Sequence, residues 1–119
     1  MLPAAARIRR RDDFSAAIRG GSRTGRALLT GHLLIEPGSA PPRVGFVVSR
    51  AVGGAVVRNK VRRRLRELVR SRLNSLPAGS LLVVRANPRA ATARQSELAA
   101  ELDLVIDTLL RRQAGALSR

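Results

Sequence analysis

Short apolar runs rich in branched residues recur along the chain and predict strands. Residues 27–37 (ALLTGHLLIEP) and 43–50 (RVGFVVSR) are two such runs, separated by the turn-forming sequence GSAPP. We expect them to form two strands that pair antiparallel across this short connection. A third run, SLLVVRANP at 80–88, lies between LPAG and Pro88 and predicts a buried strand.

The segment FSAAIRG follows two aspartates and ends at two glycines. We expect a short amphipathic helix that begins near Asp12, with Asp12 and Asp13 as its cap and Gly20 as its stop. The positions that give this segment its helical spacing are Phe14, Ala17 and Ile18.

A longer amphipathic helix is predicted from Thr92 to Arg112, with Thr92 and Gln95 spaced as a capping box. Its apolar positions fall on one face, so we expect the helix to pack on the sheet. Those positions are Leu98, Leu102, Val105, Ile106 and Leu109. Four of the eight acidic residues also lie on this helix, so the positive charge is concentrated elsewhere: Glu97, Glu101, Asp103 and Asp107.

The stretch RNKVRRRLRELVR, residues 58–70, predicts a helix with one apolar and one basic face. Projecting residues 56–73 at helical spacing puts the apolar side chains on one side, at Val57, Val61, Leu65, Leu68 and Val69. Arginines recur every fourth residue from Arg58 to Arg70, although each such like-charged pair costs about 0.2–0.5 kcal/mol. Solvated helix faces usually alternate in sign, so a polyanionic partner explains this pattern better than water does.

Composition supports a nucleic-acid partner. The chain has 119 residues, 23 basic and 8 acidic, with a net charge of +15. This length predicts one domain, and this charge favours binding to a polyanion. Because 22 of the 23 basic residues are arginine, a GC-rich genome explains the choice of arginine as readily as a functional need. Forked guanidinium groups nevertheless suit phosphate oxygens.

Several other classes of protein fit the sequence poorly. There is no cysteine and only one histidine, which excludes disulfides and leaves little for a zinc site. No apolar segment is long enough for a signal peptide or a membrane span, so a cytoplasmic location is expected. A basic amphipathic helix could instead lie on an anionic membrane, but this one lacks Trp and Phe on its apolar face.

Protein-based hydrolysis of RNA is also not expected, because it needs a positioned acid and base or a carboxylate cluster. His32 lies in a predicted strand, and the only adjacent acids, Asp12 and Asp13, are interpreted as a helix cap. The glycines of VGGAVVRNK match neither a phosphate loop nor a dinucleotide fingerprint. Asn59 in this stretch could bond a base edge or a 2′-hydroxyl, or could cap its own helix.

The stretch RVGFVVSRAVGGAVVRNKVRRRLRE, residues 43–67, resembles the signature of the bacterial ribonuclease P protein component. The likeness extends to RIRRRDDFSAAIRGGSRTGR at 7–26 and to GSLLVVRANP at 79–88, and only the last dozen residues are uninformative. It implies a single α+β domain over residues 1–119. The implied fold is a two-layer α/β sandwich with a mixed sheet of about four strands, helices on one face and a left-handed βαβ crossover around the basic helix.

The resemblance also implies a function. In that family an RNA subunit is catalytic, and the protein helps bind precursor tRNA and the Mg²⁺ that the RNA needs. The implied activity is that of an endoribonuclease that removes the 5′ leader of precursor tRNA as an RNA–protein holoenzyme. The protein alone is expected to be inactive, and the expected partners are one catalytic RNA per protein and precursor tRNA, without a membrane. The rival hypothesis is a ribosomal or other structural RNA-binding protein.

Two groups of site residues follow from the resemblance. The RNA-binding group is Arg50, Arg58, Asn59, Lys60, Arg62, Arg63, Arg66 and Arg70. The group expected to line a cleft for the 5′ leader, between the N-terminal helix and the sheet, is Arg7, Phe14, Ile18 and His32.

The sequence departs from the family pattern at five positions, three of them in these two groups and two close to the RNA-binding group. Lys60 replaces the usual arginine and loses its forked geometry. Ala51 and Gly54 replace a basic residue and an asparagine. Ile18 and His32 occupy positions where relatives often carry aromatic residues, and the chain has no Tyr or Trp, so base stacking should be weaker than usual. His32 could stack on a base or could be an ordinary strand residue.

Overall fold

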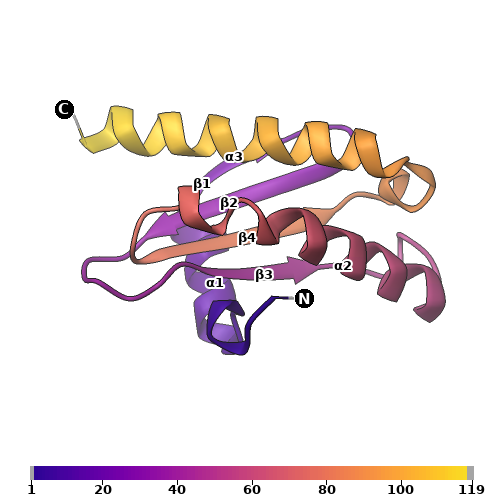
Figure 1. The fold of residues 1–119 in the computed structure, drawn as a ribbon, viewed down its shortest axis with the longest axis horizontal. Coiled ribbons are helices and arrows are strands. Elements are labelled where there is room, and N and C mark those ends of the chain that lie inside the picture. The colour runs from indigo at the N-terminus through magenta and orange to yellow at the C-terminus, as the bar shows by residue number, and fades with distance from the viewer. Residues whose placement is uncertain (1, 118–119) are drawn as a thin grey trace.

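A computed structural model describes residues 2–117 and shows four strands in one mixed sheet (Figure 1). The strands are β1 (Ser22–Gly25), β2 (Leu29–Ile35), β3 (Arg43–Val47) and β4 (Ser80–Ala86), and their order across the sheet is β1-β2-β4-β3. β4 pairs antiparallel with β2 and parallel with β3, while β1 pairs antiparallel with β2 at one edge. The mixed sheet of about four strands is therefore confirmed.

The predicted hairpin between residues 27–37 and 43–50 is wrong, because β4 lies between β2 and β3. β4 is buried at six of its seven positions, with only Arg85 exposed. So apolar a strand is most stable in the interior of the sheet, where both of its edges are hydrogen-bonded and both of its faces are covered. A short connection makes pairing of its two strands easy, but it does not exclude a third strand from the space between them.

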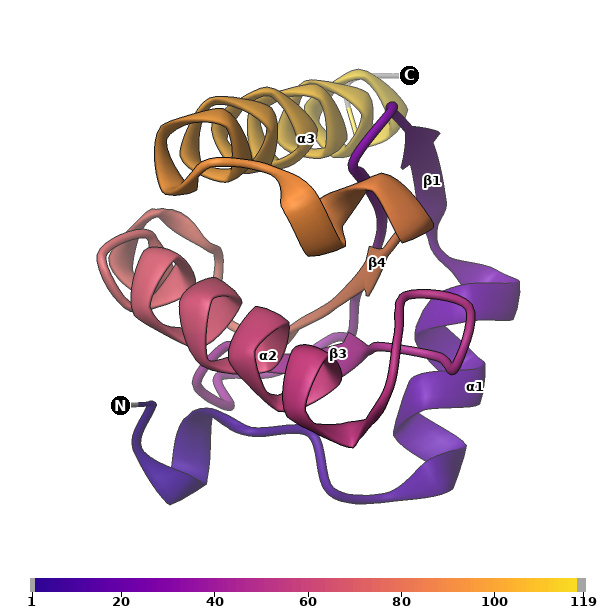
Figure 2. The ribbon, with the colours of Figure 1, turned by 90° about the vertical axis from the view of Figure 1, so that its right-hand side faces the viewer.

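The helices are α1 (Arg11–Gly20), α2 (Ala55–Arg70) and α3 (Gln95–Leu117). Between β3 and β4 the chain passes through α2, which makes a crossover between neighbouring parallel strands. In Figure 2 the two strands point toward the viewer and the chain passes clockwise from β3 through α2 to β4. This crossover is left-handed, in agreement with the fold that the resemblance implied.

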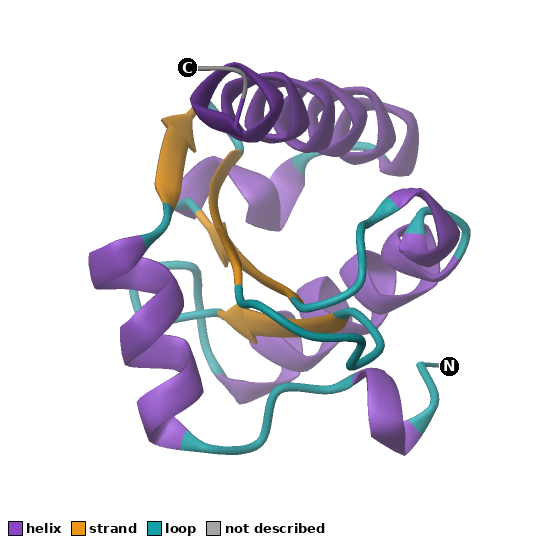
Figure 3. Cartoon of the chain, turned by 90° about the vertical axis from the view of Figure 1, so that its left-hand side faces the viewer, coloured by secondary structure: helices purple, strands orange, loops and turns teal. Residues whose placement is uncertain are grey.

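The three helices cover both faces of the sheet (Figure 3). α2 and α3 lie on one face, as expected, but α1 lies on the other. Successive side chains of β4 point to opposite faces. Leu82 and Val84 therefore join the main core beneath α2 and α3, whereas Leu81 and Val83 pack with Ile8 and with α1. Because β4 is apolar on both faces, helices on one face alone would leave Leu81 and Val83 in water.

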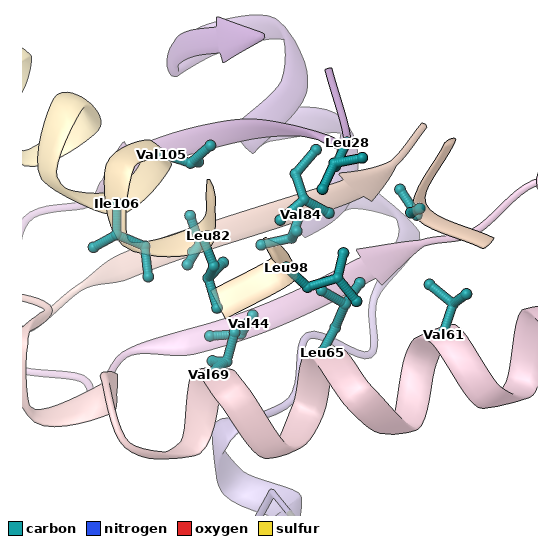
Figure 4. Close-up of a cluster of buried hydrophobic side chains, with 14 of the residues drawn as sticks. Leu28, Val44, Val61, Leu65, Val69, Leu82, Val84, Leu98, Val105 and Ile106 are labelled. Atoms are coloured by element: carbon teal, nitrogen blue, oxygen red, sulfur yellow. The ribbon is translucent and has the colours of Figure 1, made fainter. Parts of the chain in front are cut away.

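The main core contains the apolar faces predicted for α2 and α3 (Figure 4). All five predicted positions of α3 are at most 1% exposed, namely Leu98, Leu102, Val105, Ile106 and Leu109. On α2, Val61, Leu65 and Val69 are fully buried and Leu68 is partly buried. Val57 remains 37% exposed because it lies in the first turn of α2, before the helix reaches the core.

Both predicted helix caps are wrong. α1 begins at Arg11, with Asp12 and Asp13 in its first turn and no side-chain hydrogen bond at its cap. Asp13 instead forms an ion pair of 2.9 Å with Arg43 of β3. Thr92 lies in a 3-10 turn that starts at Pro88, so α3 begins only at Gln95. Its first turn is stabilised by the Glu97 carboxylate, which accepts a hydrogen bond of 2.8 Å from the backbone N–H of Arg94.

Arg72 joins the end of α2 to α3. Its guanidinium donates to Asp103 at 2.5 Å and to Asp107 at 2.7 Å. Glu101 of α3 accepts a hydrogen bond of 3.0 Å from the backbone N–H of Leu28. The acids of α3 are thus used within the fold, on contacts that hold this helix to α2 and to the start of β2.

The close contact of α3 with Gly31 of β2 gives a test of this packing. A Cβ added at Gly31 would lie 2.4 Å from Val105 Cγ1 and 3.0 Å from Leu109 Cδ1. We predict that Gly31→Ala lowers the free energy of unfolding by about 1–3 kcal/mol through overpacking. Urea unfolding should show this loss, while the control Gly20→Ala, which has open space within 4 Å, should stay close to the parent. Equal stability of the two variants would contradict the packing of α3 on β2.

Candidate nucleic-acid interface

The outer face of α2 is a cationic surface, which we define by Lys60, Arg62, Arg63 and Arg66. Together with Asn59 and Glu67, its three arginines line a shallow groove of about 670 Å³. Lys60 and Arg63 are exposed, whereas Arg62 and Arg66 are partly buried. Since Val61, Leu65 and Val69 turn the opposite face of the helix into the core, this surface is held in a fixed orientation toward solvent.

Asn59 orients one of these arginines. Arg62 Nη1 donates a hydrogen bond of 3.1 Å to Asn59 Oδ1, and Arg62 Nη2 reaches the carbonyl of Val48 at 3.5 Å. The residue at the cap position of α2 is Gly54, which has no side chain and an extended backbone. The alternative that Asn59 caps its own helix is therefore wrong, and its amide group is directed to the cationic surface instead.

The arginines of α2 differ in their partners. Arg64 Nη1 donates to the carbonyl of Ala93 at 3.2 Å, and Arg70 forms an ion pair of 3.4 Å with Glu67. Within residues 2–117, no acid pairs with Arg62, Arg63 or Arg66. Three neighbouring guanidinium groups without a direct ion pair in this range favour an external anion, because their mutual repulsion is then relieved.

The other face of the sheet holds a cleft of about 580 Å³ beside α1. Ile18 of α1 and His32 of β2 both line it, so the structure brings together two of the residues predicted for a leader cleft. Ala51, one of the departures from the family pattern, lines it as well. The remaining lining residues from the strands are Arg23, Thr30, Val47, Val83, Arg85 and Ala86.

The other two predicted cleft residues lie elsewhere. Arg7 and Phe14 line a smaller pocket of about 150 Å³ together with Arg62 and Arg66. The Phe14 ring packs on the backbone of β3, where a Cβ at Gly45 would lie 2.4 Å from two ring carbons. Phe14 thus joins the N-terminal segment to the cationic surface of α2 and does not line the cleft that contains His32.

Among the remaining predicted residues, Arg50 is exposed in the turn between β3 and α2. Arg58 is partly buried, and its Nε lacks a hydrogen-bond partner. The Nε of Arg7 is buried and unpartnered in the same way. Both side chains can donate to a ligand without breaking a bond within the fold.

His32 is only 7% exposed, and its Nδ1 is buried without a hydrogen-bond partner. Burial lowers the pKa of His32 below its ordinary value, and the positive charges of Arg23 and Arg85 lower this pKa further. The cleft-lining residues include no aspartate or glutamate that would oppose this effect. At neutral pH the imidazole is therefore uncharged, between two cations.

Sequence reasoning missed Arg23 and Arg85. Arg85 interrupts the apolar run SLLVVRANP, which was a usable signal that one position of this strand faces solvent. Arg23 lies in the polar segment SRTG of β1, which showed no apolar alternation and was not predicted as a strand. Its place in the cleft depends on the pairing of β1 with β2.

The described residues contain neither a metal-binding cluster nor a membrane-spanning helix. Among residues 2–117 no three histidine, aspartate or glutamate side chains lie together as they would to hold a metal ion. No helix within this range is both long and apolar enough to cross a membrane.

Comparisons with known proteins agree on one family. The sequence model of the family described as Ribonuclease P matches residues 2–110. A Ribonuclease P protein component from Streptomyces bikiniensis is 57% identical over 118 residues, which cover 92% of this chain and 96% of the relative. Another from Thermobifida fusca is 55% identical over 118 residues and covers 93% of this chain and 80% of its own length.

Solved structures show the same fold. The RNase P protein of Staphylococcus aureus aligns with a TM-score of 0.80 at 24% identity, over 87% of this chain and 94% of its own. The RNase P protein of Thermotoga maritima aligns with a TM-score of 0.73 at 25% identity, over 88% of this chain and 96% of its own.

The environment of His32 gives a titration test. We predict that NMR of the imidazole shows a pKa below the ordinary value of about 6.5, and that Arg23→Gln or Arg85→Gln raises it. Arg111→Gln, which removes the same charge from α3, should leave this pKa unchanged. Because the folded pKa is the lower one, the contribution of His32 to stability is present above pH 6.5 and is lost as the pH falls through the folded pKa. A pKa above 6.5 would contradict the cleft geometry.

Proposed function

The chain belongs to the ribonuclease P protein family, and we propose that within this enzyme it binds both the catalytic RNA and the single-stranded 5′ leader of precursor tRNA. The chain is thereby a ribonuclease P protein component that acts in tRNA processing. The proposed reaction of the holoenzyme is hydrolysis of the phosphodiester between leader and tRNA, which leaves a 5′-phosphate on the tRNA. The location proposed for it is the bacterial cytoplasm.

The cationic surface of α2 is assigned to the catalytic RNA. The observation that supports this most directly is the set of Arg62, Arg63 and Arg66, which have no ion-pair partner within residues 2–117 and lie on a helix that turns Val61, Leu65 and Val69 into the core. Guanidinium groups at helical spacing can follow a phosphate backbone and release its counterions. Arg50, Arg58, Lys60 and Arg70 extend the same surface along α2 and the turn before it.

The cleft on the α1 face is assigned to the 5′ leader. A single strand is narrow enough to lie between a helix and a sheet, and its bases can be splayed onto side chains. Ile18 and His32 offer one apolar and one flat polar side chain there. Arg7 and Phe14 lie beside Arg62 and Arg66, where they are placed to contact RNA at the boundary between the two surfaces.

Catalysis is assigned to the RNA and not to the protein. His32 is the only histidine, and no acid lines the cleft with it, so the protein offers no acid and base pair at that place. The described residues contain no cluster of ligands for Mg²⁺, and we therefore propose that the RNA holds most of this ion. The stoichiometry proposed is one protein per RNA.

The packing of α2 supports an RNA partner over a membrane surface. An interfacial helix needs a free apolar face, and α2 buries Val61, Leu65 and Val69 in the main core. If the protein had a purely structural RNA-binding role, cleavage of precursor tRNA would not depend on it. The proposal requires that cleavage does depend on the protein.

The test is a reconstitution. Precursor tRNA is incubated at low magnesium with RNA-free protein, with a bacterial ribonuclease P RNA, and with both. We expect cleavage only when both are present, since the protein holds the substrate and the RNA performs the chemistry. Cleavage by RNA-free protein would contradict the assignment of catalysis, and no effect of the protein on cleavage by the RNA would favour a structural role.

A pair of charge-matched variants locates the RNA-binding surface in the same assay. Arg63→Gln/Arg66→Gln removes two charges from the cationic surface, and Arg94→Gln/Arg111→Gln removes two from α3 and its start. Only the first variant should need more RNA for half-maximal cleavage, with a salt slope flatter by about 0.9 for each phosphate that the protein no longer neutralises. Equal behaviour of the two variants would place the RNA-binding surface away from α2.

A further inference from the structure

We propose that Arg23 and Arg85, which flank His32 in the cleft, form a phosphate-binding site that holds one phosphodiester of the single-stranded leader. This inference rests on the proposed function of the cleft, and it adds two arginines to a site for which the resemblance implied Arg7, Phe14, Ile18 and His32. Neither arginine belongs to the groups of residues that the resemblance implied.

The sheet register places the three side chains together. Arg23 of β1 is the Cα partner of His32 in β2, and His32 is in turn the partner of Val83 in β4. Arg85 follows Val83 by two residues and therefore points to the same face. Thr30, the partner of Arg85, has Gly25 as its other neighbour, and because Gly25 has no side chain there is room for the Arg23 side chain beside Thr30.

α1 leaves this part of the sheet open. The helix and the segment before it cover the sheet where Phe14 packs over Gly45 and where Ala17 is fully buried with Leu81 and Val83. At the end of α1 the cover stops, and Ile18 is 43% exposed at the rim of the cleft. The Arg23, His32 and Arg85 side chains lie beyond this rim, within reach of a ligand.

The Arg23 guanidinium points along the sheet and not away from it. Its Nη2 and Nη1 would lie 3.7 Å and 3.8 Å from a Cβ placed on Gly25, a position whose nearest other atom is Thr30 Oγ1 at 3.7 Å. The group thus lies over the row that ends in Thr30 and Arg85. Its backbone is fixed from the opposite side, because Arg112 of α3 donates a hydrogen bond to the carbonyl of Arg23.

Neither guanidinium has an ion pair or a hydrogen bond from its side chain within residues 2–117. Other arginines of the protein do form ion pairs, since Arg43 binds Asp13 at 2.9 Å and Arg72 binds two aspartates of α3. The acids that could have neutralised Arg23 and Arg85 are absent from the cleft lining. Two guanidinium groups that face one cleft without an ion pair in this range present a strong positive potential to an anion.

His32 supplies a second, independent sign of a ligand. Its Nδ1 is buried in the cleft wall without a partner, although buried polar groups are nearly always hydrogen-bonded. A phosphodiester between the two arginines would accept a hydrogen bond from this nitrogen once the ring turns Nδ1 toward the cleft and Nδ1 carries a proton. Its negative charge would also reverse the field that now lowers the pKa of His32.

A phosphodiester of a single strand fits this site better than a stacked base does. The chain has two phenylalanines and no Tyr or Trp, and Phe14 is outside the cleft, so aromatic stacking contributes little here. Arginine guanidinium groups can take the place of aromatic stacking, because they bind the phosphate and can also lie flat on an adjoining base. Apolar Ile18 and Val47 at the walls of the cleft leave room for the sugar and base that follow.

The test uses holoenzyme reconstituted with a bacterial ribonuclease P RNA. Equilibrium binding of precursor tRNA and of mature tRNA is compared for the parent, Arg23→Gln, Arg85→Gln and the control Arg111→Gln. We expect each cleft variant to lose about 5- to 30-fold in affinity for precursor tRNA, the range of one charge-assisted contact. Affinity for mature tRNA should change less than about twofold, within the effect of an ordinary surface substitution. Thermal unfolding verifies that the variants fold.

Leader chemistry identifies the contacted group. Single leader phosphodiesters are replaced one at a time by neutral methylphosphonates. At one position this replacement should weaken binding of precursor tRNA to the parent holoenzyme. The same replacement should not further weaken binding to the holoenzyme that contains Arg23→Gln/Arg85→Gln. The inference is overturned if the cleft variants bind like Arg111→Gln while the parent still prefers precursor tRNA. If the parent itself does not prefer precursor over mature tRNA, the proposed function of the cleft fails and the inference fails with it.

A titration of the His32 pKa by NMR separates an RNA site from a general anion site. A short single-stranded RNA added to the protein should raise this pKa, and inorganic phosphate at the same phosphorus concentration should not. An equal rise with inorganic phosphate would show a general anion site and overturn the assignment to the leader.

Discussion

Burial of β4 on both faces is the constraint on which the rest of the structure depends. Leu82 and Val84 must be covered on one side of the sheet, and Leu81 and Val83 on the other. α2 and α3 cover Leu82 and Val84, and α1 covers Leu81 and Val83. The basic helix is consequently held on one face while the cleft forms on the opposite face, at the place where the short α1 ends. The two surfaces that we propose to bind RNA thus follow from the packing of one strand.

The distribution of charge follows the same division. With 23 basic and 8 acidic residues, most cations have no carboxylate to pair with. The acids of α3 are used on Arg72 and on the backbone of Leu28, and Asp13 is used on Arg43. These pairs hold elements of the fold together. The arginines outside them, on α2 and in the cleft, remain available to phosphates.

Local periodicity was enough to predict the long elements. The apolar faces of α2 and α3 are confirmed nearly position by position, because a helix that repeats every 3.6 residues has only one side to bury. Strand pairing is a property of the whole chain, so the expected hairpin between β2 and β3 failed when β4 entered between them. The polar strand β1 had no pattern of its own, and the cleft role of Arg23 could not be seen without it.

Resemblance supplied what periodicity could not, namely the left-handed crossover and the hypothesis of a leader cleft. It also grouped Phe14 with His32, whereas the structure places the two in different pockets. The reason is Gly45, whose missing side chain lets the Phe14 ring lie on β3, in the pocket that Arg62 and Arg66 also line. Residues that a family resemblance groups together can therefore lie in different pockets.

The central claim is that opposite faces of the sheet contact different RNAs. Its most direct test is photo-crosslinking in the holoenzyme with precursor tRNA, using a photoreactive amino acid at position 60 on α2 or at position 18 on α1. The account predicts that position 60 crosslinks to the catalytic RNA and position 18 to the 5′ leader. Crosslinks from both positions to the same RNA, or an exchange of the two, would contradict it.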